Sequence, residues 1–296
     1  MKTFHWISKI KDLFSRFCHD IGDLPQGEKS VIRLEPDKIF EVRKKKIDRL
    51  ISILENDYFE RNEHGMLNFL SAEKREKFSV FETENISAHG YDSHARKIIG
   101  DFKDGLILDC GCGLRSSYLE NVVNYEIVPY LTTDVLGVAE ELPFKDEAFD
   151  AVFSLNVLEH VKDPFKSAKE ISRVLKRGGI LYCVVPFLQP VHGYPSHYYN
   201  MTAAGLKNLF EEKLKIKKQF VYKSGLPIHG LKWLLESWAE GLDGKAKESF
   251  LNMAVKEFLK DPYSQLNNEY VTELSDQKNF ELACTTSLIA VKEDKI

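Results

Sequence analysis

The sequence lacks several features that would place the protein in a specialised class. It contains no run of about 18 apolar residues, so no segment predicts a membrane-spanning helix. The N-terminus has no unbroken apolar core of the kind that a secretory signal needs. We find neither internal repeats nor low-complexity linkers. With 296 residues, of which 43% are hydrophobic and 29% charged, the chain is typical of a globular protein with a sizeable core.

Charge and cysteine content narrow the class further. The net charge of −4 provides no overall basic surface, so we expect no nucleic-acid partner. The five cysteines are odd in number, scattered and free of any C-x-x-C pair, which predicts reduced thiols in a cytoplasmic protein. Cys110 and Cys112 form a C-x-C pair, but a structural zinc site needs four ligands and no second spaced pair exists. We therefore predict no metal site and interpret these two thiols as small residues packed at a turn.

A short apolar strand runs directly into a glycine turn. The stretch L-I-L-D-C-G-C-G-L-R-S-S begins at Leu106, and its first three residues are typical of a buried parallel strand. Asp109, Gly111 and Gly113 then form the pattern D-x-G-x-G. Glycine in such a turn permits left-handed dihedrals and lets a ligand approach the backbone. A nicotinamide-binding fingerprint needs a third glycine where Ser116 stands, which disfavours an NAD-dependent oxidoreductase.

The rest of the chain alternates between predicted strands and helices. Strands are expected at 122–128, 132–138, 149–156, 180–185, 215–222 and 282–291. A helix is expected after Asp163 and Pro164, with one apolar stripe made of Phe165, Ala168, Ile171 and Leu175. This alternation predicts an α/β fold, with a Rossmann-like, mostly parallel sheet of seven strands covered by helices on both faces. A helical insertion is expected before the last strand.

Three sequence strings extend the pattern of the glycine turn. They are LPF-x-D-x-x-FD-x-V, VLEHV-x-DP and E-x-x-RVLK-x-GG, and with D-x-G-x-G they resemble class I methyltransferases that use S-adenosylmethionine. The resemblance spans roughly residues 90–225 and is greatest to the subgroup that methylates small molecules and lipids. It implies an enzyme that binds S-adenosyl-L-methionine and methylates a small-molecule, glycan or lipid-linked acceptor.

The resemblance also implies a set of cofactor-binding residues. Asp109, Gly111 and Gly113 would surround the amino-acid end of the cofactor, and Ala139 and Glu140 would lie near the adenine. Glu126 follows Asp109 by 17 positions, a spacing at which a carboxylate suits a ribose diol. Asn156 joins this set because ligands of open α/β sheets bind beyond the carboxyl ends of strands. A helix cap at Asp109 and a solvated strand end at Glu126 are the structural alternatives.

Two departures from the family pattern support a different function. Many relatives carry an acidic residue immediately before the Ala-Glu pair, where this sequence has Val138. The interval from Gly113 to Glu126 leaves room for only about two helical turns. Both departures motivate the alternative that the protein is a catalytically inactive, methyltransferase-like binding or scaffold protein.

An uncharged loop at 186–202 follows the fifth predicted strand and is the expected acceptor site. We predict His192, His197 and Tyr198 as catalytic residues, because an imidazole or a phenol can take a proton from a hydroxyl. An aromatic lid without proton transfer is the alternative. His160 is interpreted as a structural hydrogen-bonding residue.

The two flanks complete a division into three parts. Residues 1–85 are predicted as an N-terminal helical extension, 86–225 as the cofactor-binding core, and 226–296 as a helical lid with the closing strand. Residues 1–20 form an amphipathic helix, expected to pack on the domain or a partner, or to contact a membrane surface through residues 4–18. In a second helix after Pro36, the charge run Arg43–Lys46 is interpreted as a solvated face. The oligomeric state is not predicted.

Overall fold

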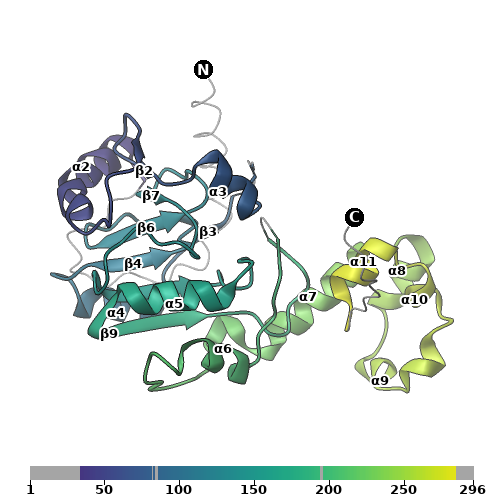
Figure 1. Cartoon of the computed structure of the whole chain (residues 1–296). Helices are drawn as coiled ribbons and strands as arrows, with labels where there is room; N and C mark the ends of the chain where they lie inside the picture. Colours follow the sequence, from purple (N-terminus) through teal and green to yellow (C-terminus); the bar gives the residue numbers. More distant parts are fainter. Residues whose placement is uncertain (1–33, 82, 84–85, 194–195, 285–296) are drawn as a thin grey trace, which may run out of the picture.

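The computed structural model describes residues 34–284 apart from 82, 84–85 and 194–195 (Figure 1). The amphipathic helix predicted at 1–20 and most of the closing strand predicted at 282–291 lie outside these residues. No helix within the described ranges is long and apolar enough to cross a membrane.

A seven-stranded sheet forms the centre of the molecule (Figure 1). Its strands lie in the order β1-β2-β7-β6-β4-β8-β9, and every neighbouring pair is parallel except the antiparallel pair β1–β2. The α/β fold with a mostly parallel, seven-stranded sheet is thus confirmed. The strands are β1 (Glu60–Arg61), β2 (Leu67–Asn68), β4 (Ile107–Cys110), β6 (Val122–Glu126), β7 (Val135–Leu136), β8 (Phe149–Leu155) and β9 (Leu175–Val184).

Helices cover both faces of this sheet. Alternate residues of β4 point to opposite faces, because side chains in a strand alternate with a period of two. Leu108 lies in one apolar cluster with residues of α2 (Pro36–Ser52) and α5 (Pro164–Val174). Ile107 lies in a second cluster with residues of α4 (Ser93–Asp101). The continuous apolar character of β4 therefore reflects burial from both sides.

One of the predicted strands is wrong, because residues 215–222 form no strand. Of the strand predicted at 282–291, only residues 282–284 are described, and Leu282 ends the helix α11 (Asp276–Leu282), so the rest of that strand stays a prediction. Residues 215–222 do alternate, but Phe220 packs its ring parallel to that of Tyr182 at 6.3 Å, and Val221 is exposed. Among the described residues, β1 and β2 complete the seven strands instead.

The helix α5 begins as predicted, but two residues of its predicted apolar stripe differ, because Phe165 is exposed and Leu175 lies beyond the helix, as the first residue of β9. The Asp163 side chain accepts a hydrogen bond from the backbone N–H of Lys166 at 2.9 Å, and Pro164 is the first helical residue. Ala168 and Ile171 are fully buried, whereas Phe165 is 60% exposed. Pro164 occupies the inward position one turn before Ala168, which directs Phe165 outward.

The charge run of α2 is not a solvated face, because two of its cations are buried. Arg43 and Lys46 approach Asp134, with Arg43 Nε 3.3 Å from Oδ1 and Lys46 Nζ 2.7 Å from Oδ2. The Tyr118 hydroxyl also donates to Asp134, and Lys46 donates to the Val122 carbonyl at 2.5 Å. A polar cluster of opposite charges therefore fastens α2 to the sheet.

The C-terminal helices form a group beside the sheet (Figure 1). The helix α7 leads from the sheet side to the others, and residues of this group share an apolar cluster of their own, which includes Leu242, Phe250 and Leu274. The remaining elements are α3 (Ala72–Lys77), β3 (Ala88–His89), β5 (Leu114–Arg115), α6 (Ala203–Phe210), η2 (Lys223–Gly225), α7 (Pro227–Glu240), α8 (Gly244–Leu251), α9 (Val255–Phe258), η3 (Pro262–Gln265) and α10 (Glu269–Thr272).

Candidate functional site

The glycine turn after β4 is closely packed on two sides. Gly111 and Gly113 have φ values of +76° and +60°, which glycine adopts readily. A Cβ atom at Gly111 would lie 2.4 Å from Cγ2 of Val157, and one at Gly113 would lie 2.6 Å from the Ser87 carbonyl oxygen. Both positions therefore require glycine for conformation and for space.

The Asp109 carboxylate is fully buried and doubly bound beneath this turn. Arg115 binds it in a bidentate manner, with Nε 2.7 Å from Oδ2 and Nη2 2.9 Å from Oδ1. The Tyr91 hydroxyl donates to Oδ2 at 2.6 Å, and burial raises the pKa of that phenol, which keeps it protonated as a donor. Asp109 therefore fixes the turn through an internal charge pair. It is not a helix cap, because Asp109 lies within β4 and the glycine turn and β5, not a helix, come directly after it.

Glu126 meets the glycine turn at the end of β6. Its Oε2 accepts a hydrogen bond from the Gly113 N–H at 2.7 Å, and its Oε1 accepts one from the Ile127 N–H at 2.8 Å. Burial raises the pKa of this carboxyl group, while the backbone donors lower it. The Val128 N–H is a third backbone donor to this carboxylate. One of its four lone pairs therefore remains for a ligand hydroxyl.

The connection between β4 and β6 differs from the sequence prediction. We expected about two helical turns between Gly113 and Glu126, but the described residues there contain the short strand β5 and no helix. β5 pairs in parallel with β3, which brings residues 86–91 over the turn. The N–H groups of residues 111–114 all donate within the protein, to the carbonyls of Tyr125 and Ser87 and to Glu126, and no helix N-terminus lies at the turn.

The residues predicted near the adenine are buried. Ala139 and Glu140 are 6% and 3% exposed. Burial raises the pKa of Glu140, and the backbone N–H groups of Asp163 and Lys162 oppose this, so the carboxylate interacts with the loop before α5. Val138 packs in an apolar cluster with Leu70, Val80 and Leu136.

Asp134 does not replace the acidic residue that is absent at Val138. Its carboxylate is bound by Lys46 and Arg43, and Oδ2 also accepts from the Asn124 N–H at 2.9 Å. The side chain is fully buried. Asp134 therefore belongs to the attachment of α2.

Asn156 lies at the carboxyl end of β8 and has an unusual backbone. It is exposed and has a φ of +57°, while its N–H donates to the Val184 carbonyl at 2.9 Å. Asparagine tolerates this left-handed conformation better than most residues, and such strain is frequent at functional sites. β8 is the parallel neighbour of β4, so Asn156 and the glycine turn share one edge of the sheet.

Two of the predicted catalytic residues, His192 and His197, come together in the loop after β9, whereas the ring of Tyr198 lies beside that of Tyr199. The rings of His192 and His197 have centroids 4.4 Å apart, and Tyr198 donates its N–H to the Glu159 carbonyl at 2.7 Å. His197 uses both ring nitrogens, because Nδ1 accepts from the His192 N–H at 3.2 Å and Nε2 lies 3.0 Å from Asn200 Oδ1. His192 retains Nε2 without a partner among the described residues.

Sequence analysis missed several residues of this region. Tyr91 and Arg115 were not predicted to bind Asp109, although Arg115 follows Gly113 by only two positions. Glu159 was seen only as part of the string VLEHV, yet it is fully buried, and burial raises its pKa to about 8. His160 does form the expected structural hydrogen bond, from Nδ1 to the Ser196 carbonyl at 2.8 Å.

The two cysteines of the turn are buried. Burial raises the pKa of both thiols, Cys110 and Cys112, well above the usual range. Both side chains are therefore protonated at neutral pH and pack as small apolar groups.

Comparison with known proteins identifies the central part of the chain. Residues 108–183 match the family model of a methyltransferase domain. The chain is 32% identical over 106 residues to the chloroplastic 2-methyl-6-phytyl-1,4-hydroquinone methyltransferase 2 of Oryza sativa subsp. japonica, a match that covers 36% of this chain and 28% of that protein. It is also 32% identical over 104 residues to a ubiquinone/menaquinone biosynthesis C-methyltransferase of Haemophilus ducreyi, covering 35% and 39% of the two.

These matches are partial. The chain spans less than half the length of the curated relatives that it matches first. Among solved structures, a putative methyltransferase of Bacillus halodurans is 19% identical with a TM-score of 0.34, over 57% of this chain and 88% of that one. Phosphoethanolamine N-methyltransferase 2 of Haemonchus contortus, solved with S-adenosyl-L-methionine, is 18% identical with the same TM-score, over 60% and 47%.

Proposed function

We propose that the protein is an S-adenosylmethionine-dependent methyltransferase, because residues 108–183 match the family model of a methyltransferase domain. The observation that carries this proposal is the glycine turn, in which Gly113 donates to Glu126 while Asp109 is locked by Arg115. Glu126 would accept from the ribose hydroxyls, and the backbone of 111–113 would face the amino-acid end of the cofactor. Ala139, Glu140 and Asn156 complete the proposed cofactor site.

We propose that the acceptor is a small molecule, either free or part of a glycan or lipid. Two relatives named for quinol or quinone methylation support the coarser class of small molecules. The acceptor would approach from the loop 186–202, beside the edge of the sheet that carries the glycine turn. A lipid-linked acceptor would be consistent with the predicted contact between residues 4–18 and a membrane surface. Residues 4–18 lie outside the described part of the chain.

The proposed reaction is an in-line displacement. A lone pair of the acceptor attacks the methyl carbon, the carbon–sulfur bond breaks, and its electron pair remains on sulfur as a neutral thioether. The enzyme would contribute alignment and exclusion of water. A hydroxyl acceptor must also lose a proton, and among His192, His197 and Tyr198 the imidazole of His192 has the uncommitted ring nitrogen.

Calorimetric titration with S-adenosylmethionine, combined with thermal melting, tests the cofactor assignment. Cofactor at about 100 times its dissociation constant should add about 2.7 kcal/mol to the free energy of unfolding, which corresponds to several degrees in the melting temperature. Glu126→Ala should remove most of this shift. Glu120→Ala, at an exposed position, is the control and should retain it. Absence of binding to the unaltered protein would reject the cofactor.

A non-catalytic binding protein is the second candidate function. Its supporting observation is the buried Val138 in the apolar cluster, which leaves no acidic group at that position. This candidate predicts cofactor binding without turnover. Incubation of the protein with methyl-labelled cofactor and a cell extract separates the two functions, and mass spectrometry of a labelled product would identify the acceptor and exclude the binding protein.

A further inference from the structure

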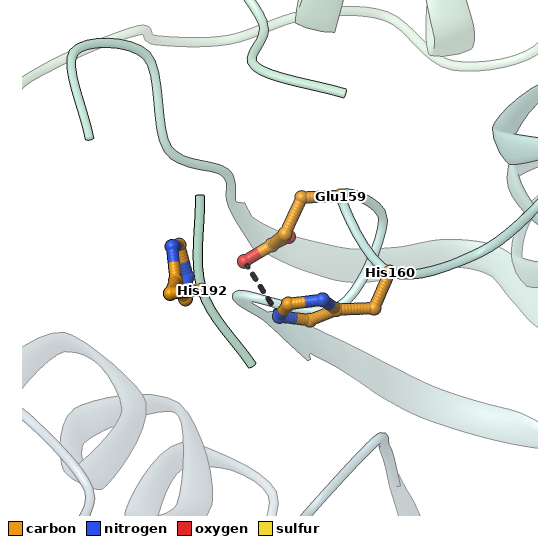
Figure 2. A group of neighbouring side chains, drawn as sticks. All are labelled: Glu159, His160 and His192. Carbon is orange, nitrogen blue, oxygen red and sulfur yellow. Dashed lines mark ion pairs between the residues drawn. The ribbon is translucent and has the colours of Figure 1, made fainter. Parts of the chain in front are cut away.

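A group of potential metal ligands lies where the loop after β9 crosses the residues that follow β8. Figure 2 shows Glu159, His160 and His192, whose ligand atoms all lie within 4.8 Å of one another. His160 Nε2 is 3.9 Å from Glu159 Oε1. The group draws on two chain segments more than thirty positions apart, so it is formed by the fold.

Hydrogen bonds fix which nitrogen of each ring is available. His160 Nδ1 lies 2.8 Å from the Ser196 carbonyl oxygen, and His192 Nδ1 lies 2.8 Å from the Pro190 carbonyl oxygen. A carbonyl only accepts, so both rings carry their proton on Nδ1 and have the lone pair on Nε2. A backbone carbonyl on the second nitrogen is the usual support of a metal-binding histidine.

Glu159 supplies an independent sign of a missing ligand. Its side chain is fully buried, and neither carboxylate oxygen has a hydrogen-bond partner among the described residues. Buried carboxylate oxygens are almost always paired, because the loss of hydration is otherwise uncompensated. Figure 2 shows the carboxylate directed toward the two imidazoles.

The surrounding chain holds this arrangement tightly. The N–H groups of Tyr198 and Tyr199 both donate to the Glu159 carbonyl, at 2.7 and 3.3 Å, so the loop is fastened to the residue that bears the carboxylate. Gly193 has a φ of +78°, and a Cβ atom there would lie 2.4 Å from Cε1 of His160. The loop therefore approaches the ring as closely as only glycine allows.

We infer that Glu159, His160 and His192 form a binding site for one divalent transition-metal cation, with Zn²⁺ the best fit. Two imidazoles and one carboxylate are a typical protein ligand set for Zn²⁺ with an open position. In a tetrahedral site with bonds of about 2.0–2.2 Å, two ligand atoms lie about 3.4 Å apart. The three ligand atoms here lie up to 4.8 Å apart, so they need to move about 1 Å closer together when the cation binds. Mg²⁺ prefers an all-oxygen environment and is disfavoured.

The open position gives the site a chemical role that goes beyond cofactor binding. Glu159 follows Asn156 by three residues, so the cation would lie near the edge of the sheet where the proposed methyl transfer takes place. A hydroxyl oxygen bound there loses its proton to solvent more readily, because the cation stabilises the alkoxide. His192 would then act as a ligand rather than as a base. This role, unlike the metal site itself, rests on the proposed function.

Direct metal titration tests the site without the methyl-transfer reaction. Untagged, chelator-treated protein is titrated with Zn²⁺ by calorimetry and with Co²⁺ by visible absorption. We expect one cation per chain for the unaltered protein and a loss of affinity of at least about 100-fold in Glu159→Gln. His229→Gln, which alters an exposed histidine of α7, should bind the metal normally. Mg²⁺ should not weaken the binding of Zn²⁺ in the same titration.

Folding and cofactor binding are controlled separately. The metal-free Glu159→Gln protein should melt no lower than the metal-free unaltered protein, because the substitution removes an unpaired buried carboxyl group. Equal affinity of the Glu159→Gln and unaltered proteins for Zn²⁺, or the absence of uptake by the unaltered protein, would overturn the site. Binding of S-adenosylmethionine is measured on the same samples and does not depend on the metal. Failure of the metal site is therefore distinguishable from failure of the proposed methyltransferase function.

Discussion

At the residue scale, the glycine turn shows how much of a site depends on backbone shape. Its two glycines were predicted from the sequence because the pattern D-x-G-x-G follows an apolar strand. The partners of Asp109 were not predictable, since Tyr91 reaches it from the segment between β3 and α4, and Arg115 reaches it from β5. A side chain that is fixed by contacts of the folded chain leaves no periodic signal in the sequence.

Gly111→Ala should distinguish backbone strain from collision. The left-handed φ costs a side chain about 1–2 kcal/mol, and overpacking against Val157 adds about 1–3 kcal/mol. Gly178→Ala is the matched control, because φ is +77° there but no atom lies within 4 Å of the added Cβ. Denaturant unfolding should show the larger loss for Gly111→Ala, and only that protein should lose cofactor binding. Equal losses would mean that contact with Val157 does not matter.

At the element scale, the helices were predicted better than the strands at the edges. The capped start of α5 followed from Asp163 and Pro164, because capping is local chemistry. The buried charges of α2 were not foreseen, since the partner Asp134 lies about ninety positions away in the chain. The strands β1 and β2 have two residues each, which is too short to show the alternation by which a strand is recognised in a sequence.

Lys46→Met should loosen the attachment of α2 strongly. The substitution leaves Asp134 with one fewer cation in a buried position, and breaking a buried pair typically costs about 3–5 kcal/mol of the free energy of unfolding. Lys45→Met changes the same residue type at an exposed neighbouring position and should stay within about 0.5 kcal/mol. Chemical denaturation measures both. A small effect at Lys46 would show that the ion pair offers no net stabilisation.

Glu141 links α3 to α5 and should make the free energy of unfolding depend on pH in the acidic range. Lys77 and Lys166 lie 2.7 and 3.0 Å from its Oε1, and these hydrogen bonds hold the pKa of Glu141 down, at about 2, against burial. Because the folded pKa is depressed, the contribution is complete above the unfolded value of 4.5 and declines as pH falls toward 2.

We therefore expect Glu141→Gln to cost about 1 kcal/mol at pH 7, since the partners are largely solvated. The difference in the free energy of unfolding between the two proteins should shrink between pH 4.5 and 2. Glu120→Gln should show no such trend. A constant difference across this range would mean that the ion pairs do not stabilise the folded state.

At the scale of the whole molecule, two separate apolar clusters indicate two units of stability. One contains the main sheet core with Phe144, and the other lies among the C-terminal helices around Phe250. The division into 1–85, 86–225 and 226–296 stays a proposal, and β1–β2 already join the first part to the sheet.

Calorimetric melting should accordingly show two transitions. Phe250→Ala removes a side chain that is 4% exposed, and its cost of about 3–5 kcal/mol should lower only the transition of the C-terminal helices. Phe144→Ala, at a fully buried position, should lower the other. S-adenosylmethionine should raise only the transition that Phe144→Ala lowers. A single transition, shifted by both substitutions, would show that the chain unfolds as one unit.

The position of α2 in the chain has a consequence for synthesis on the ribosome. The helix ends at Ser52, whereas β9, the last strand of the sheet and part of the same apolar cluster as α2, ends at Val184. At translation rates of about 5–20 residues per second, the apolar side of α2 emerges roughly 7–26 s before the sheet is complete. The apolar side of α2 therefore stays uncovered while more than a third of the chain is synthesised, which gives chaperones time to bind it.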